Sequence, residues 1–205
     1  MPTFEEQRQE VIHLAQFCAA KGWLPATSGN LSTLVSRGGE ALQIAITRSG
    51  ADKQQLSPDD VLLIDEHMHV LNSEQYRPSA ETSVHVELYQ KLEDCGCILH
   101  VHTIYNNLIS ELYGDGGGVD VNGHELLKAL GHWEEDASIR IPIVPNWADL
   151  GRLGRAVGEV AQKDVPLVLV RNHGIYAWGD SPAAARRHLE AAEFLFEYLY
   201  RLRSA

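Results

Sequence analysis

The chain has 205 residues, of which 44% are hydrophobic and 22% are charged, a composition typical of ordinary globular proteins. This length predicts one domain, residues 1–205, with a core large enough to fold without disulfide bonds. The formal net charge of −11 and the scatter of the basic residues exclude a nucleic-acid-binding surface, and no apolar run reaches the ~20 residues of a membrane span.

Hydrophobic spacing and turn residues predict helices and strands mixed along the whole chain. Helices are expected from Thr3 to a stop at Lys21-Gly22, from Ser79 onward, over 103–112, 125–130 and 150–162, and from Ser181-Pro182 onward. Strands are expected over 42–47, 61–64, 68–71, 97–102, 139–144 and 165–171. The sequence therefore predicts an α/β layered fold.

Three local signals refine this prediction. Thr3 and Glu6 have the spacing of a capping box, and Ser79 is expected to cap the helix that follows it. The runs 61–64 and 68–71 predict a hairpin, which argues against a purely parallel sheet. Pro142 indicates an irregular strand or one near an edge of the sheet. We therefore expect a mixed, mainly antiparallel sheet.

The chain has three cysteines, Cys18, Cys95 and Cys97. Their odd number and the lack of a signal-peptide pattern favour a reducing, cytoplasmic location. Cys95 and Cys97 lack a second pair at zinc-binding spacing, so we expect them to be small residues that enter a buried strand.

The sharpest local signal for chemistry is His100-Val101-His102. Residues i and i+2 of a strand point to the same face, so both imidazoles can bind one cation. A catalytic zinc site uses three protein ligands and leaves a position open. His173 follows an apolar strand and is the best third candidate. The other pair of this spacing, His67 and His69, lies in a polar turn and is a weaker alternative.

Three Ser/Thr/Gly-rich turns are candidate phosphate-binding elements, because they combine hydroxyls with glycines that allow close backbone approach. They are Thr27-Ser28-Gly29-Asn30, Thr47-Arg48-Ser49-Gly50 and Arg77-Pro78-Ser79-Ala80-Glu81. Each is weak evidence alone, since such turns usually have no ligand.

The order of these elements resembles the class II aldolase and adducin-head superfamily over nearly the whole chain. The matching motifs are Ser28-Gly29-Asn30, Thr47-x-x-Gly50, Pro78-Ser79-x-Glu81, His100-x-His102 and His173-Gly174. The resemblance implies a three-layer αβα fold, one Zn²⁺ per subunit on the three histidines, and a homotetramer. It also implies that a sugar-phosphate substrate is bound through its phosphate by Ser28, Gly29, Asn30, Thr47, Ser49, Gly50 and Ser79.

Within the family, several segments are similar to enzymes of methionine salvage that dehydrate a 2-ketose 1-phosphate with a methylthio group on carbon 5. These segments are 25–30, 77–82, 99–103, 124–130 and 173–179. This likeness implies a hydro-lyase in which Glu125 performs the main proton transfer and Glu81 assists. From the residues alone, either glutamate is also typical of a helix start.

Two alternatives stay open. The first is an aldolase or 4-epimerase on the same scaffold, which would break or re-form a carbon–carbon bond. The second is a non-catalytic scaffold like the adducin head, which the three histidines and two glutamates disfavour. Storage of metal by the ten histidines is a weaker idea, because they are scattered along the chain.

Overall fold

The computed structural model describes residues 2–38 and 42–204, in which eight strands form one sheet. Their order across the sheet is β3-β2-β1-β4-β8-β7-β6-β5. The strands are β1 (Asn30–Ser36), β2 (Gln43–Thr47), β3 (Val61–Asp65), β4 (Cys97–Val101), β5 (Gly118–Asn122), β6 (Ser138–Val144), β7 (Leu167–Val170) and β8 (Gly174–Gly179). Only the β6–β7 pairing is parallel, so the expected mixed, mainly antiparallel sheet is confirmed.

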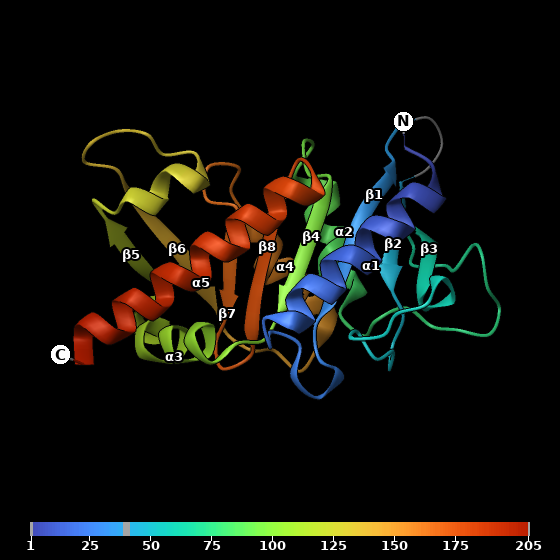
Figure 1. Cartoon of the computed structure of the whole chain (residues 1–205), viewed down its shortest axis with the longest axis horizontal. Helices are drawn as coiled ribbons and strands as arrows, with labels where there is room; N and C mark the ends of the chain where they lie inside the picture. The colour runs from blue at the N-terminus through green and yellow to red at the C-terminus, as the bar shows by residue number, and fades with distance from the viewer. Residues whose placement is uncertain (1, 39–41, 205) are drawn as a thin grey trace.

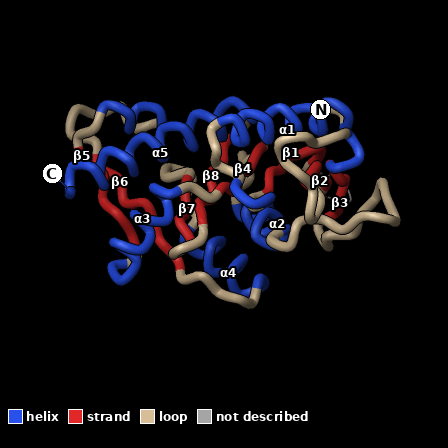
Figure 2. The backbone as a smooth tube through the Cα atoms, turned by 60° about the horizontal axis from the view of Figure 1, so that its bottom comes forward, coloured by secondary structure: helices blue, strands red, loops and turns tan. Residues whose placement is uncertain are grey.

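Helices cover both faces of this sheet (Figures 1 and 2). The α-helices are α1 (Phe4–Ala20), α2 (Thr82–Lys91), α3 (Ile104–Tyr113), α4 (Leu150–Val160) and α5 (Pro182–Ser204). The 3₁₀ helices are η1 (Pro25–Thr27), η2 (Pro58–Asp60), η3 (Gly114–Gly116) and η4 (Glu125–Leu130). One apolar cluster joins α1, α3, α5 and η4 to one face, and a second joins α2 and α4 to the other. The expected three-layer αβα fold is confirmed. Within the described ranges, no helix is long and apolar enough to cross a membrane.

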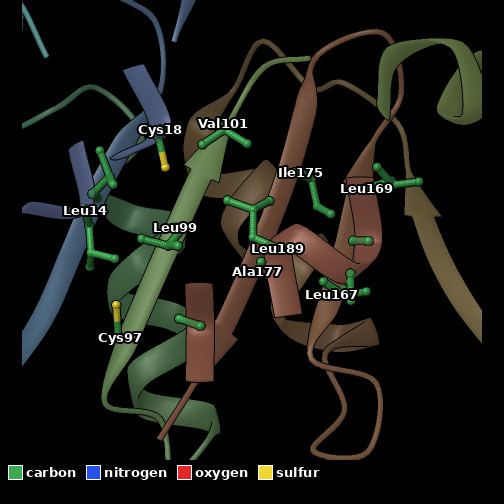
Figure 3. Close-up of a cluster of buried hydrophobic side chains, with 14 of the residues drawn as sticks. Leu14, Cys18, Cys97, Leu99, Val101, Leu167, Leu169, Ile175, Ala177 and Leu189 are labelled. Carbon is green, nitrogen blue, oxygen red and sulfur yellow. The ribbon is translucent and has the colours of Figure 1, made fainter. Parts of the chain in front are cut away.

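The central strand β4 divides its side chains between the two faces. Cys97, Leu99 and Val101 belong to the cluster beneath α1 and α5 (Figure 3). Because side chains of a strand alternate, Ile98 and His100 point to the opposite face, where Ile98 packs with α2 and α4. The alternation therefore directs His100 toward the α2 side of the sheet.

The local signals at several helix ends are confirmed. Thr3 and Glu6 form the reciprocal hydrogen bonds of a capping box, and Ser181 Oγ accepts from the N–H of Ala184 at the start of α5. The three cysteines are free and buried, as expected for core residues. Pro142 lies in β6, which is next to the edge strand β5.

Ser79 does not cap the following helix. Its hydroxyl donates to the carbonyl oxygen of Thr47 at 2.7 Å, and α2 begins only at Thr82, with Glu81 in the N-cap position. This hydrogen bond, between residues 32 positions apart, outweighs the local cap and leaves the Glu81 carboxylate at the helix start.

The hairpin expected at residues 61–71 is incomplete. After β3, the returning segment makes only an isolated bridge between Val70 and Ile64. The Oδ1 atom of Asp65 accepts from the backbone N–H groups of His67 and His69, which makes a tight polar turn instead of a longer strand.

Three strands were not expected from the sequence: β1, β5 and β8. They contain Asn, Asp or Gly residues, which are depleted in strands. β1 and β8 each lie between two neighbouring strands in the sheet, so pairing on both sides stabilises them despite these residues.

Candidate functional site

Three histidines and one glutamate converge where β4 and β8 meet the start of α2. His100 lies on β4, His102 just after it, His173 just before β8, and Glu81 at the N-cap of α2. β4 and β8 are antiparallel neighbours, so the end of one lies beside the start of the other. One ligand atom from each of the four residues lies within 4.8 Å of the other three.

The backbone and a side-chain amide orient two of the imidazoles. His100 Nδ1 lies 3.0 Å from the carbonyl oxygen of Ile175, and His173 Nδ1 lies 3.2 Å from Asn146 Oδ1. Both oxygens are acceptors, so each Nδ1 carries a hydrogen and each Nε2 is the nitrogen directed into the site. Such partners fix the tautomer and ring orientation of histidines that bind metals.

The Nε2 atoms of His100 and His102 are only 2.9 Å apart. Burial, then the neighbouring His100 and His173, lower the pKa of His102 to about 3, so this imidazole is neutral at neutral pH. A neutral imidazole is the form that binds a cation.

The Glu81 carboxylate lies between two of these histidines. Its Oε2 is 3.1 Å from His100 Nε2, and its Oε1 is 2.9 Å from His173 Nε2. Burial alone would raise the pKa of Glu81, but the charge and hydrogen bonds of His100 and His173 outweigh burial and hold it well below the usual range. Three imidazoles and one ionised carboxylate match the donors that zinc prefers, and also suit iron, cobalt or manganese.

Two glycines allow the close packing around the histidines. A Cβ on Gly174 would lie 2.5 Å from the Val101 carbonyl oxygen and 2.7 Å from His102 Cδ2. Gly29 has a φ of +76°, and its Cβ would lie 2.7 Å from the His100 carbonyl oxygen. Any larger residue at either position would displace backbone or ligand atoms.

The structure brings the three candidate phosphate elements together beside this group. Thr47 Oγ1 lies 3.2 Å from Ser79 Oγ and accepts from the N–H of Leu31. The N–H of Ser49 donates to the carbonyl oxygen of Arg77. The hydroxyls of Thr47 and Ser79 are buried and already engaged in these bonds, so within the chain they brace the three turns against one another.

Two groups beside these turns are suited to binding an anion. Ser28 Oγ is buried and has no hydrogen-bond partner within the described ranges. Lys53 is only 4% exposed, and its Nζ donates to the carbonyl oxygen of Thr27 at 2.8 Å. Burial, then the charge of Arg48, lower the pKa of Lys53, whose own charge contributes to lowering the pKa of His102. Sequence reasoning missed Lys53, because a single lysine in a polar loop gives no sign of burial.

Glu125 lies elsewhere in the chain. It is on η4, its side chain is 78% exposed, and it forms an ion pair with Lys128 at 2.9 Å. η4 packs through Leu127 and Leu130 on the face covered by α5, whereas Glu81 belongs to the α2 face. Within one chain, the structure therefore brings Glu81 to the histidines and leaves Glu125 apart from them.

The alternative pair, His67 and His69, lies in the exposed turn after β3. The His69 ring contacts the Asp65 carboxylate at 3.0 Å. Neither histidine belongs to the metal-binding group that the described residues form.

Comparison with known proteins agrees with this architecture. Residues 9–200 match the family model described as Class II Aldolase and Adducin N-terminal domain. The chain belongs to the class II aldolase family. A solved structure of YgbL, a putative aldolase/epimerase/decarboxylase from Escherichia coli, has a TM-score of 0.81 at 23% identity, covering 97% of this chain and 90% of that one. An L-fuculose 1-phosphate aldolase has a TM-score of 0.77 at 23% identity, covering 97% and 86%. These two likenesses concern the fold.

Relatives with higher identity share one name, methylthioribulose-1-phosphate dehydratase. The protein of that name from an Exiguobacterium species is 46% identical over 202 residues, covering 98% of this chain and 97% of its own length. The one from Bacillus subtilis is 43% identical over 205 residues, covering 100% and 97%. The one from Persephonella marina is 43% identical over 200 residues, covering 96% and 92%. The family expected from the sequence motifs is confirmed.

Proposed function

We propose that this class II aldolase family member is a hydro-lyase that removes water from 5-methylthioribulose 1-phosphate, a step of methionine salvage. The product is 2,3-diketo-5-methylthiopentyl 1-phosphate. The observation that carries the proposal is the convergence of Glu81 with His100, His102 and His173. The name shared by relatives that are 43–46% identical over almost the whole chain supports this choice of substrate.

The chemistry of this substrate explains why such a site is needed. The hydrogen on carbon 3 is acidified only by the neighbouring ketone, so its removal leaves negative charge on the ketone oxygen. Zinc held by the three histidines would supply Lewis-acid stabilisation of that charge. The site residues have to bind the substrate, accept the carbon-bound proton and protonate the departing hydroxyl of carbon 4.

Glu81 is suited to orient a water close to the reacting carbons. Its carboxylate is ionised, and both of its oxygens are fixed by histidines. We assign the main proton transfer to Glu125 and an assisting role to Glu81. Since Glu125 lies apart from the histidines of its own chain, the assignment requires that another copy of the chain supplies it. This agrees with the homotetramer implied by the family resemblance.

The phosphate is proposed to bind at the turns 27–30, 47–50 and 77–81. Ser28 Oγ provides a buried hydroxyl without a protein partner in the described part of the chain. Lys53 adds a positive charge that is already desolvated, and a desolvated charge interacts strongly with an anion. Because the chain as a whole is acidic, this local positive charge is important for binding a phosphorylated sugar.

An aldolase or 4-epimerase acting on another sugar phosphate is the second candidate. It would use the same metal-binding group. The fold similarity to an L-fuculose 1-phosphate aldolase is the reason to retain this second candidate. A non-catalytic scaffold is disfavoured, because a scaffold has no need for four convergent ligands beside a desolvated lysine. Zinc as the native metal, the cytoplasmic location and the single domain over residues 1–205 are further parts of this proposal.

The decisive experiment is an assay of the purified, metal-analysed protein with methylthioribulose 1-phosphate, followed by mass spectrometry. We expect a product lighter by one water, formed by the zinc-loaded protein and lost after chelation. The control is His173→Ala, which removes one ligand. A triose fragment would identify an aldolase instead, and an intact substrate with zinc fully bound would reject this substrate.

A further inference from the structure

A chain of hydrogen bonds leads from the metal-binding group into the core beneath α2. Asn30 Nδ2 donates to Glu81 Oε2 at 2.9 Å, and Asn30 Oδ1 lies 2.5 Å from His85 Nε2. On its other side, His85 Nδ1 lies 2.7 Å from Ser32 Oγ, which lies 3.0 Å from Tyr89 Oη. The four residues beyond Glu81 are at most 4% exposed, so they depend on each other for hydrogen bonds.

Regular spacing on two elements produces this arrangement. Glu81, His85 and Tyr89 are four residues apart, which places them on one side of α2. Asn30 and Ser32 are two residues apart on β1, so both face that helix. The pattern is not visible in either segment alone, because it depends on α2 packing against β1.

The orientation of the Asn30 amide fixes the direction of each hydrogen bond. Its Nδ2 donates to Glu81 Oε2, so its Oδ1 is the atom that faces His85 Nε2. Oδ1 only accepts, so the hydrogen of His85 is on Nε2. Burial, then the charge of His100, lower the pKa of His85 to about 3, so the ring is neutral and Nδ1 has no hydrogen. Nδ1 must then accept from Ser32, whose oxygen accepts from Tyr89.

We propose that His85 is a positioning residue: by donating Nε2–H to Asn30, it holds the amide in the orientation that fixes the Glu81 carboxylate beside the metal-binding histidines. The consequence for catalysis rests on the function proposed above. Without this donor, Asn30 can turn over and direct its oxygen at Glu81. Two acceptors at 2.9 Å repel each other, so Glu81 loses its partner or moves away from the histidines.

Three variants test the role of this donor. His85→Leu removes it, whereas His85→Gln retains an N–H at about the position of Nε2. Val86→Ala is the control, because this neighbouring buried residue of α2 belongs to the apolar cluster. We expect His85→Leu to lower kcat and zinc affinity by about 10–100-fold, as for other residues that orient metal ligands. His85→Gln is expected to recover most of both, and Val86→Ala to retain both while losing stability.

Zinc affinity is measured by competition with a chelator, and kcat at full zinc occupancy. A His85→Leu variant that behaves like Val86→Ala would overturn the proposal, and so would a His85→Gln variant as impaired as His85→Leu. A second measurement uses the zinc-free wild-type protein: ¹⁵N NMR of the side chain is expected to find His85 with its hydrogen on Nε2. A hydrogen on Nδ1 would contradict the proposal. If the wild type fails to dehydrate the proposed substrate, the zinc competition and the tautomer still decide the role of His85.

Discussion

The ring of Tyr176 lies almost parallel to the imidazole of His100, with centroids 4.1 Å apart and planes differing by 14°. The two residues are directly opposite each other on β8 and β4, so the register of the sheet stacks them. β8 also holds His100 Nδ1 through the carbonyl oxygen of Ile175. One strand therefore orients this histidine through both its ring face and its nitrogen.

Tyr176→Phe separates the ring from the hydroxyl. Tyr176 Oη is buried and has no hydrogen-bond partner within residues 2–38 and 42–204. We expect Phe to keep zinc affinity and to leave the free energy of unfolding unchanged or higher by about 1 kcal/mol, because a buried unsatisfied hydroxyl is lost. Tyr176→Ala is expected to cost about 3–5 kcal/mol and to weaken zinc binding. Urea unfolding of the metal-free protein and chelator competition measure both. Weak zinc binding by the Phe variant would contradict the prediction that the hydroxyl does not contribute to zinc affinity.

Gly174→Ala tests the close packing between β8 and the histidines. The new methyl group would lie within 3 Å of the Val101 carbonyl oxygen and of both the His100 and His102 rings. We expect a loss of about 1–3 kcal/mol in stability, as for other overpacked sites, and a larger fractional loss of bound zinc. Gly116→Ala is the matched control, because its Cβ would meet only one atom, at 3.9 Å. Normal zinc content in Gly174→Ala would show that the ligands adapt to the extra atom.

Lys53→Met tests whether the buried lysine binds the phosphate. The change keeps an apolar stem and removes the charge, so we expect KM to rise by about 10–100-fold, the range of a hydrogen bond to a charged group. A smaller effect on kcat is expected, because Lys53 is not one of the four residues of the metal-binding group. Lys163→Met, at an exposed ion pair with Asp94, controls for the change in net charge. An unchanged KM for the phosphorylated substrate would place the phosphate elsewhere.

The sequence predicted that His100, His102 and His173 would lie together. Two of them share a strand, and the third belongs to a motif of the family that the chain resembles. Glu81 was predicted as an assisting carboxylate and not as a member of the metal-binding group. The capping box of Thr3 was also predictable, since all of its partners lie within one helical turn. Features whose cause lies within a few residues can be predicted from the sequence without knowledge of the fold.

The features that were missed depend on contacts between distant segments. The burial of Lys53 follows from the turn that contains Thr27, 26 residues earlier. The role of His85 follows from Asn30, 55 residues away, and the capping function expected of Ser79 was lost to Thr47. In each case a polar side chain takes a partner that only the packed sheet supplies, and no local pattern predicts the choice.

Acidification of the metal-free protein should reveal the buried His85. Its pKa of about 3 in the folded chain lies below the ordinary value of 6.5, so between these values the unfolded chain binds the extra proton. Stability is therefore lost as the pH falls below about 6.5, by up to about 1.4 kcal/mol per pH unit from this residue. We expect urea unfolding at pH 7, 6 and 5 to give a shallower decline for His85→Gln than for the wild type. If the free energy of unfolding fell equally with pH in both proteins, the folded chain would accommodate the charged His85 ring.

The separation of Glu125 from Glu81 leads to a test with two inactive variants. If each site takes Glu81 from one copy and Glu125 from another, Glu81→Gln and Glu125→Gln are both inactive alone but complement each other when co-assembled. Random mixing in equal amounts leaves about one quarter of the sites with both glutamates, so about a quarter of wild-type activity should return. Each variant is first checked for bound zinc, and separately assembled variants combined just before the assay serve as the control. Sites built within a single chain would give mixed assemblies without any intact site, and activity would then stay absent.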